Sequence, residues 1–348
     1  MKDPVVAVAL SGGIDSLVSG FLLKQRYKDI FGLHFTTGYE KRHIDPGMLE
    51  NQLGFPVFEI DLSDIFEQNV VQYFIKTYLD GKTPNPCIIC NKKIKFGTLL
   101  ENAFQKGADF LATGHYATVV NSISFPDRRI STPYLEKGSD PLKDQSYFLS
   151  LLSADQLEHI LFPLSGMTKE QVRQTANSNG ITPLFPSESQ DICFIHDNNF
   201  SAFIVNKQNH TPEPGKIKDL SGKTVGHHGG LHKYTIGQRR GLNCPASQPY
   251  YVKHIDIKNN VLTVCFKAQL NCKALAVNQI NWNYPDPPPV DDMITKIRYS
   301  HKGAASRLTI DENALGNIIF DTPQNAVTPG QAAVFYKDRR VLGAGIIQ

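Results

Sequence analysis

The amino-acid sequence predicts an α/β fold, with a parallel sheet in its first part and a β-rich last third. Short apolar runs alternate with helix-like stretches through the first half, which is typical of βαβ units. A loop of small residues follows the first apolar run, as expected at the carboxyl end of a parallel strand. In the last part of the chain, short strand-like runs separated by turn residues indicate a small barrel.

In the first half, four apolar runs are predicted to be strands: residues 5–10, 30–35, 57–60 and 109–113. Helical periodicity is predicted between them over residues 17–27 and 64–80. Because ligands bind at the carboxyl ends of parallel strands, the loop after residue 10 and the pair Gly114-His115 should share one site.

The second half changes in character. Helices are predicted over residues 151–160 and 169–179, the second ending at Gly180. A hairpin with strands 250–257 and 261–266 follows a stretch rich in glycine, proline and basic residues. After a Pro-rich segment, further strands are predicted at 293–299, 332–336 and 341–347. We therefore expect three domains, over residues 1–200, 201–272 and 273–348.

Length and composition are those of an ordinary globular protein: 348 residues, 41% of them hydrophobic and 20% charged. No apolar run approaches the roughly 20 residues of a membrane span, and the N-terminus lacks a signal-peptide pattern. We therefore expect a cytoplasmic protein without membrane contact. The net charge of +3 neither requires nor opposes nucleic-acid binding, and six cysteines in such a chain do not indicate a disulfide scaffold.

The junction after the first strand reads Ser11-Gly12-Gly13-Ile14-Asp15-Ser16. Its glycines let backbone N–H groups converge, and the helix that follows directs its positive end at the loop. The two serines add hydroxyl donors, and Asp15 could hold a Mg²⁺ that screens phosphate charge. The string is neither a Walker loop nor a dinucleotide GxGxxG motif. It predicts a phosphate or pyrophosphate site.

Two further motifs contain cysteine. In residues 83–96, Cys87 and Cys90 precede three lysines, whose charge is expected to lower the pKa of the thiols. In residues 187–195, Cys193 follows a polar loop. A zinc site would need a second closely spaced ligand pair, and Cys193 with His196 is a poor match. Inert buried cysteines are the other alternative; reactive sulfur chemistry is the favoured interpretation.

Together these motifs resemble the tRNA-specific 2-thiouridylase family of PP-loop ATP pyrophosphatases. The matching blocks also include residues 112–117 (ATGHYA), 143–148 (KDQSYF), 232–241 (HKYTIGQRRG) and 328–331 (TPGQ). They cover nearly the whole chain in the order found in the family. The resemblance implies a Rossmann-like PP-loop domain, a small α+β central domain that binds tRNA, and a C-terminal β-barrel.

The resemblance also implies ATP-dependent thiolation of the tRNA wobble uridine. ATP would adenylate the C2 oxygen, and sulfur from a cysteine persulfide would displace AMP to give 2-thiouridine. The implied cofactors are ATP and Mg²⁺; the implied partners are the anticodon region of tRNA and an upstream persulfide donor, such as a cysteine desulfurase or sulfur-relay protein. The positions that match ATP-binding residues are Ala9, Leu10, Ser11, Gly12, Gly13, Ile14, Asp15, Ser16, Phe35 and Gly114.

Within this resemblance, Cys90 matches the nucleophilic cysteine and Cys193 the cysteine that carries the persulfide. Because sulfur transfer requires a thiolate to attack a sulfur–sulfur bond, the fold must bring these two residues together. The positions that match residues contacting tRNA or its target base are Asn85, Pro86, Cys87, His115, Lys143, Asp144, Gln145, Arg298, Tyr299 and Gln331.

Two departures from the family pattern are clear. The stretch of residues 36–55 is shorter than the matching stretch in the family, and Cys87 stands where many members have Asp. With Cys90 and Cys193, Cys87 completes a set of three thiolates that could instead hold a [4Fe–4S] cluster; no other metal site is indicated. More remote alternatives are a PP-loop amide-forming ligase, which needs no cysteine pair, and a non-catalytic tRNA-binding protein, which has no use for a pyrophosphate loop.

Overall fold

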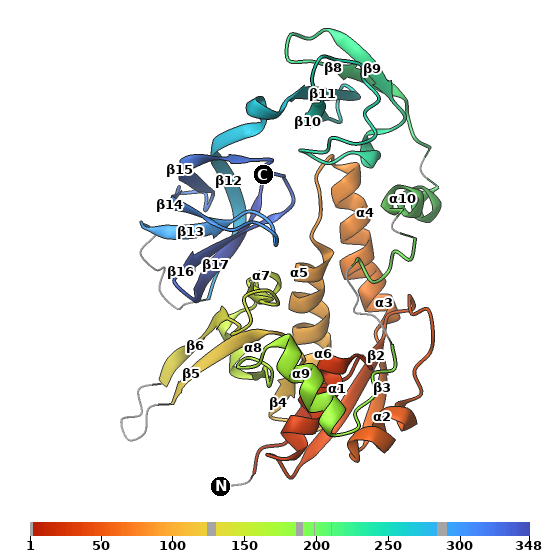
Figure 1. Ribbon diagram of the computed structural model, residues 1–348, viewed down its shortest axis with the longest axis vertical. Coiled ribbons are helices and arrows are strands. Elements are labelled where there is room, and N and C mark those ends of the chain that lie inside the picture. Colours follow the sequence, from red (N-terminus) through yellow and green to blue (C-terminus); the bar gives the residue numbers. More distant parts are fainter. Residues whose placement is uncertain (1–2, 124–129, 186–190, 198, 210, 284–290) are drawn as a thin grey trace.

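The computed structural model describes residues 3–123, 130–185, 191–197, 199–209, 211–283 and 291–348. Figure 1 shows an α/β unit at the bottom, a small sheet at the top and a barrel beside the long helical segment that joins them. The Pro-rich segment 284–290 and residues 187–190 of the second cysteine motif lie outside the described residues.

The α/β unit contains a parallel sheet with the strand order β3-β2-β1-β4-β7. Its strands are β1 (Val6–Ala9), β2 (Ile30–Thr36), β3 (Val57–Asp61), β4 (Phe110–Ala112) and β7 (Ile160–Leu161). The four predicted strands are confirmed, but the predicted helix over 151–160 is wrong at both ends. A capping box at Ser153 begins α8 (Ala154–Glu158), and Ile160 pairs with Leu111 of β4.

Helices cover both faces of this sheet. One face is packed by α1 (Ile14–Lys24), α2 (Pro46–Leu53) and α9 (Lys169–Ser178). The other is packed by α3 (Ser63–Phe66), α4 (Gln72–Leu79), α5 (Pro86–Cys90) and α6 (Leu99–Gln105). Two π-helical segments, η1 (Glu67–Val71) and η2 (Asn91–Thr98), make the runs α3–α4 and α5–α6 continuous. The predicted helix over 64–80 is thereby confirmed, with a π-turn inside it.

The middle unit follows α10 (Phe200–Gln208) and is a four-stranded sheet with the order β10-β11-β8-β9. Its strands are β8 (Gly215–Lys218), β9 (Thr224–His228), β10 (Tyr250–Asp256) and β11 (Val261–Phe266). The predicted hairpin is confirmed as β10–β11. A 3₁₀ turn, η3 (Leu231–Lys233), contacts α4, so this unit sits on the end of the helical segment.

The predicted C-terminal barrel is confirmed as a closed ring of six strands. They are β12 (Asn271–Trp282), β13 (Met293–Lys296), β14 (Ala304–Ile310), β15 (Gly316–Asn325), β16 (Ala332–Lys337) and β17 (Arg340–Ile347), with a short turn η4 (Lys267–Leu270) before them. Pairing of β12 with β17 closes the ring, which removes exposed strand edges. A hairpin of the α/β unit, β5 (Ala117–Ile123) and β6 (Ile130–Lys137), joins β17 at its end.

One turn of the barrel fits against the chain just before α5. The amide of Thr83 donates to the carbonyl of Pro329 at 2.8 Å, and the Gln331 side chain donates to the carbonyls of Thr83 and Pro84 at 3.1 and 2.9 Å. Between them, Gly330 has φ +89°, and a Cβ there would lie 2.7 Å from the Thr83 oxygen. The barrel therefore fixes the entry to the helix that carries Cys87 and Cys90.

Substitution of Gly330 tests this contact. Gly330→Ala should destabilise the protein more than Gly107→Ala, because both glycines have φ +89° but nothing lies within 4 Å of a Cβ at residue 107. Both variants incur a left-handed penalty of about 1–2 kcal/mol; only Gly330→Ala adds overpacking of about 1 kcal/mol or more. Urea unfolding of the two variants measures the difference. Equal midpoints would show that the turn is not closely packed on Thr83.

Among the described residues, no helix combines the length and the apolar character needed to cross a bilayer.

Candidate functional site

The loop between β1 and α1 is closed on itself through Ser16. The hydroxyl of Ser16 donates to the carbonyl of Gly13 at 2.8 Å and accepts from the Ser11 amide at 3.2 Å. Gly12 has φ +75°, a conformation that favours glycine. Gly13 caps α1 without a side-chain hydrogen bond, so the first amides of the helix have no side-chain acceptor at that position. This is the geometry of an anion cradle.

The structure brings Gly114 against this loop, as the sequence predicted. A Cβ at Gly114 would lie 2.8 Å from the backbone carbon of Asp15 and 2.9 Å from the amide of Ser16. The segment after β4 therefore touches the first turn of α1, and only glycine permits the approach. Phe35, at the carboxyl end of β2, is partly buried against the core on the opposite face of the sheet from α1, while Leu10 is buried at the loop entrance.

Asp15, which the sequence analysis suggests as a Mg²⁺ ligand, has hydrogen-bond partners inside the protein. Both of its carboxylate oxygens accept from the ammonium of Lys169 at 2.8 Å, and the Tyr116 hydroxyl donates to one of them at 2.6 Å. These partners fix the Asp15 carboxylate at the start of α1. The side chain of Lys169 is only 7% exposed, so the pair is well shielded on the lysine side.

Lys169 is a site residue that the sequence analysis missed. It is the first residue of α9, whose capping box at Thr168 begins the helix here. The Asp140 carboxylate accepts from the Lys169 amide at 2.9 Å, which anchors the helix start. The capping box was visible in the sequence, but the pairing with Asp15, 154 residues away, was not.

Two residues before Cys90 favour the start of a helix at this point of the chain. Asn85 caps α5 by accepting from the Ile88 amide at 3.4 Å, and Pro86 occupies the first helical position. Cys87 and Cys90 are three residues apart, so they lie on one face of α5. Cys87 is exposed and Cys90 is half-buried. Asn91 donates to the Phe148 carbonyl at 3.0 Å, which ties the end of α5 to α7 (Ser146–Leu149).

Cys193 is exposed, but the next residue is anchored deeply. Phe194 is 2% exposed. Its ring lies 5.3–5.8 Å from the rings of four aromatic residues: Tyr39, Phe66, Phe74 and Phe203. Edge-to-face contacts of this kind add stability beyond burial alone. The backbone at Cys193 is therefore fixed by its neighbour.

The three thiols of Cys87, Cys90 and Cys193 lie close enough for their charges to interact. The charge of a Cys193 thiolate raises the pKa of Cys90, and that of a Cys87 thiolate raises the pKa of Cys193, which requires short separations. All six cysteines of the chain are described and all are free thiols. The fold thus brings these residues, which are distant in sequence, into one region, here called the sulfur cluster.

The predicted lowering of the thiol pKa by a neighbouring lysine is present, from Lys95, but burial outweighs it. Burial raises the pKa of Cys90 to about 12, and the opposing charge of Lys95 is the smaller effect. Burial likewise raises the pKa of Cys193 to about 11 and raises that of Cys87. Solvent at the exposed Cys87 and Cys193 limits the rise in their pKa, so burial affects the half-buried Cys90 most.

Several residues matched to tRNA contacts have partners inside the protein. Asp144 is buried and accepts from the amides of Gly138 and Ser146, both at 3.1 Å. The Gln145 side chain accepts from the Tyr116 amide at 2.9 Å, and Gln331 holds Thr83 and Pro84. These side chains brace the frame of the site in this conformation.

His115 is also internal. Its ring is 8% exposed, lies 2.7 Å from the Thr113 hydroxyl and packs on Phe96 and Phe162. Burial, followed by the charge of Lys95, lowers its pKa well below the usual value, so the ring is neutral.

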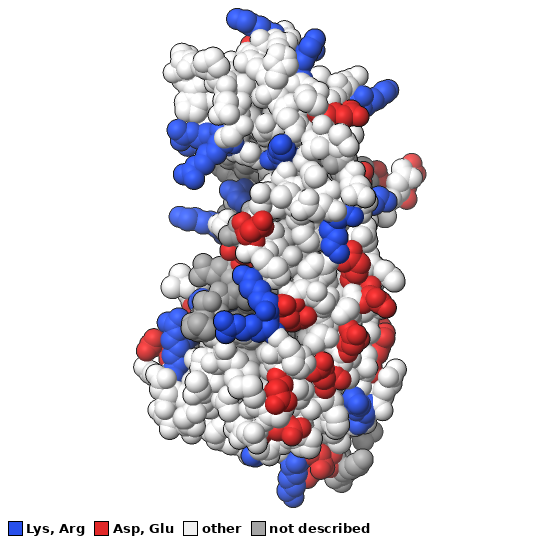
Figure 2. Space-filling model, turned by 90° about the vertical axis from the view of Figure 1, so that its right-hand side faces the viewer, with Lys and Arg blue, Asp and Glu red and all other residues white. Residues whose placement is uncertain are grey.

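Other matched residues reach solvent. Tyr299 is 39% exposed and its ring lies 4.6 Å from that of Phe148. Lys143 and Arg298 are half-buried, and Arg298 donates to the Asn325 carbonyl at 3.3 Å. An exposed aromatic ring near two cations suits an unstacked base and phosphates. Figure 2, turned by 90° from Figure 1, shows acidic side chains from the centre to the right of the lower half of that face, which disfavours RNA there.

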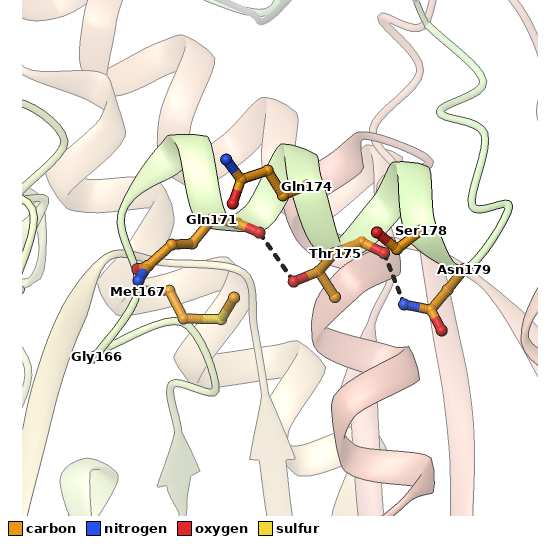
Figure 3. Close-up of a pocket in the computed structure, with 7 residues that line it drawn as sticks. All are labelled: Gly166, Met167, Gln171, Gln174, Thr175, Ser178 and Asn179. Atoms are coloured by element: carbon orange, nitrogen blue, oxygen red, sulfur yellow. Dashed lines mark hydrogen bonds between the residues drawn. The ribbon is translucent and has the colours of Figure 1, made fainter.

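A hollow of about 460 Å³ lies on α9 (Figure 3), lined by Gly166, Met167, Gln171, Gln174, Thr175, Ser178 and Asn179. These residues carry no charge and no thiol, and Lys169 of the same helix is paired instead with Asp15. The hollow therefore lacks the chemistry that marks the loop and the thiols. Among the described residues, no group of three His, Cys, Asp or Glu side chains is arranged to hold a metal ion.

Lys169 offers a test of the loop. Lys169→Met should weaken ATP binding about tenfold, or about 1.4 kcal/mol, because an uncompensated Asp15 carboxylate would repel the phosphates. Lys169→Arg should retain most of the affinity, and Arg173→Met, on an exposed position of the same helix, should leave it unchanged. Calorimetric titration with ATP gives the result. Wild-type affinity in Lys169→Met would contradict this role.

The pKa of Cys90 gives a second test. Alkylation of Cys90 in the free protein should accelerate about tenfold per pH unit from about pH 7 to pH 10, since the thiolate reacts and its fraction keeps rising below a pKa of about 12. An unstructured peptide with one cysteine should level off above about pH 8.5. Peptide mass spectrometry after iodoacetamide pulses measures both. A plateau for Cys90 near pH 8 would be inconsistent with its burial.

Comparisons with known proteins cover the whole chain. Family models described as a tRNA methyl transferase HUP domain, a tRNA methyl transferase PRC-barrel domain and an aminomethyltransferase beta-barrel domain match residues 4–197, 202–266 and 272–347. A protein of Desulfosudis oleivorans named tRNA-specific 2-thiouridylase MnmA is 46% identical, over 100% of this chain and 96% of that protein. Proteins of the same name from Desulfotalea psychrophila and Chlorobium phaeobacteroides are each 39% identical over 100% of this chain, and over 100% and 98% of their own lengths.

Proposed function

The chain belongs to the tRNA-specific 2-thiouridylase family, and on that premise we propose that it converts the wobble uridine of tRNA to 2-thiouridine. The observation that carries the proposal is that Cys87, Cys90 and Cys193 lie close enough for their charges to interact, near the phosphate loop. Lys95 links the two regions, because its charge acts on these thiols and on His115, which follows Gly114 at the loop. We expect the reaction to take place in the cytoplasm.

The first proposed step is activation of the base. The C2 oxygen of uridine attacks the α-phosphorus of ATP, and pyrophosphate leaves. The loop Ser11–Ser16 and the start of α1 offer amides and hydroxyls to the phosphates and to the departing pyrophosphate. Mg²⁺ bound to ATP would supply further screening of charge. Asp15 then serves to hold Lys169 at the loop.

The second proposed step is sulfur transfer. The terminal sulfur of a Cys193 persulfide attacks C2, and AMP leaves with the C2 oxygen. The Cys90 thiolate next attacks the inner sulfur of Cys193, forming a Cys90–Cys193 disulfide and releasing 2-thiouridine. An external thiol reductant supplies the two electrons that restore the pair, and an upstream persulfide donor reloads Cys193.

The family-model descriptions name methyl transfer, whereas the whole-chain relatives are named for thiolation. A phosphate loop and three meeting thiols suit adenylation and sulfur transfer, and methyl transfer requires neither. The exposed Tyr299, with Lys143 and Arg298, supports a tRNA partner. We therefore propose thiolation, the activity for which the relatives are named, and not methyl transfer.

A [4Fe–4S] mechanism is the second candidate, because three thiols converge. The donor set would suffice, but the described side chains are not arranged as metal ligands here, so no step is derived through a cluster. Broad absorption near about 400 nm in anaerobically purified protein would favour it. A PP-loop ligase would instead show pyrophosphate exchange that depends on a small substrate and not on tRNA.

Serine variants test the roles of the cysteines. Cys90→Ser and Cys193→Ser should each lower tRNA thiolation to about 1% or less, since no thiolate remains to complete the transfer, while tRNA binding stays within about twofold. The control, Cys265→Ser, lies in β11 of the middle unit and should retain activity. Mass spectrometry of tRNA nucleosides and a filter-binding assay give the two readouts. Thiolation by either site variant would overturn the assignment.

A further inference from the structure

The three lysines after Cys90 have different environments. Lys93 is exposed and donates to the Asn69 side chain at 3.1 Å. Lys92 is half-buried, and burial followed by the charge of Lys93 lowers its pKa. Lys95 is the one of the three whose charge acts on the sulfur cluster: it opposes the effect of burial at Cys87, Cys90 and Cys193 alike. Of the three lysines, only Lys95 therefore acts on the charge of the thiols.

The position of Lys95 depends on the π-helical register of η2. In an α-helix, five residues advance the chain to a point about 140° around the axis from Cys90. In η2 the backbone bonds span five residues, as in the Leu99 amide to the Ile94 carbonyl, so residues five apart lie on nearly the same face. This register places Lys95 one π-helical turn after Cys90, on nearly the same face of the segment.

A side chain from another helix stabilises this register. The Gln156 amide, from α8, donates to the carbonyls of Lys92 and Phe96 at 3.0 and 2.6 Å. Insertion of a side chain into a helical ladder is a recognised cause of such distortions. Pi-helical turns also occur frequently at functional sites. The irregularity of η2 is thus built into the packing of the unit.

Lys95 has no counter-ion among the residues that the structure describes. It is half-buried, and within the part of the chain that the structure describes no carboxylate or hydrogen-bond acceptor is paired with its ammonium. By contrast, Lys169 and Lys207 each have a carboxylate partner. A half-buried cation without a partner, among three thiols, is arranged for an anion that arrives or forms during the reaction.

We propose that Lys95 is the positioning cation of sulfur transfer, which stabilises anionic sulfur on Cys193 and Cys90 as the sulfur passes to the activated uridine. This inference rests on the proposed function. The charge of Lys95 offsets that of the Cys193 persulfide before attack and that of the Cys90 thiolate that closes the disulfide. It acts through the reacting sulfurs, and no covalent bond to Lys95 forms.

The test compares Lys95→Met with Lys95→Arg and with Lys93→Met as the matched control. Lys95→Met should lower the kcat of thiolation about 100-fold, as loss of one charge-stabilising group does, with the KM for tRNA within about threefold. Lys95→Arg should recover at least about tenfold of this loss because it keeps the charge. Lys93→Met should resemble wild type. ATP–pyrophosphate exchange with tRNA should persist in all three.

Cys90 alkylation at fixed pH provides a readout that does not depend on tRNA. It should slow in Lys95→Met and not in Lys93→Met. If Lys95→Met does not fold, Lys95→Gln replaces it. The inference is overturned if either uncharged variant keeps more than about a third of the wild-type kcat, or if arginine rescues no better than methionine. If wild-type protein fails to thiolate tRNA while the alkylation difference remains, the proposed function fails and the electrostatic role of Lys95 stands.

Discussion

The contact between the barrel and the chain before α5 holds the site together. Thr83 and Pro84 have backbone groups bound by Pro329 and Gln331, and the hydroxyl of Tyr147 donates to the Ala332 carbonyl at 3.0 Å nearby. Leaving one such buried group unpaired costs about 1–3 kcal/mol. Because Asn85 caps α5 directly after this contact, the position of Cys90 is set by a domain that is remote in sequence. The barrel therefore positions the helix that carries Cys90, although it supplies no reacting atom in the proposed mechanism.

A second constraint brings the other half of the sulfur pair into place. The segment that carries Cys193 has little regular structure of its own, but Phe194 is enclosed by aromatic rings from helices α3, α4 and α10 and from Tyr39. This arrangement combines a fixed backbone with an exposed thiol. In the proposed mechanism, such a thiol can receive sulfur from a donor while its segment stays anchored by Phe194.

The sequence predicted those parts of the fold and site that depend on local patterns. The apolar strands, the phosphate loop, the hairpin β10–β11 and the closing strands of the barrel all followed from periodicity and turn residues. Long-range pairings did not. The Asp15–Lys169 pair joins two helix starts 154 residues apart, and the β5–β6 hairpin joins the barrel through a single register position. Neither leaves a local signal.

The electrostatics of the thiols show a different limit. The sequence shows which residues are charged, so Lys92, Lys93 and Lys95 were all expected to lower the pKa of the neighbouring thiols. Burial, which the sequence does not display, outweighs that charge at Cys90. The π-register of η2 then selects Lys95 alone, through an amide of Gln156 that belongs to a helix more than fifty residues later.

The central claim is that Cys90 and Cys193 act on one sulfur atom within one site. Peptide mass mapping after a single turnover, with persulfide-loaded protein, ATP and tRNA but no added reductant, tests it most directly. We predict a Cys90–Cys193 disulfide that forms only when ATP and tRNA are both present, in proportion to the 2-thiouridine produced. Accumulation of 2-thiouridine with both cysteines still free, or with either joined to a different cysteine, would contradict the account.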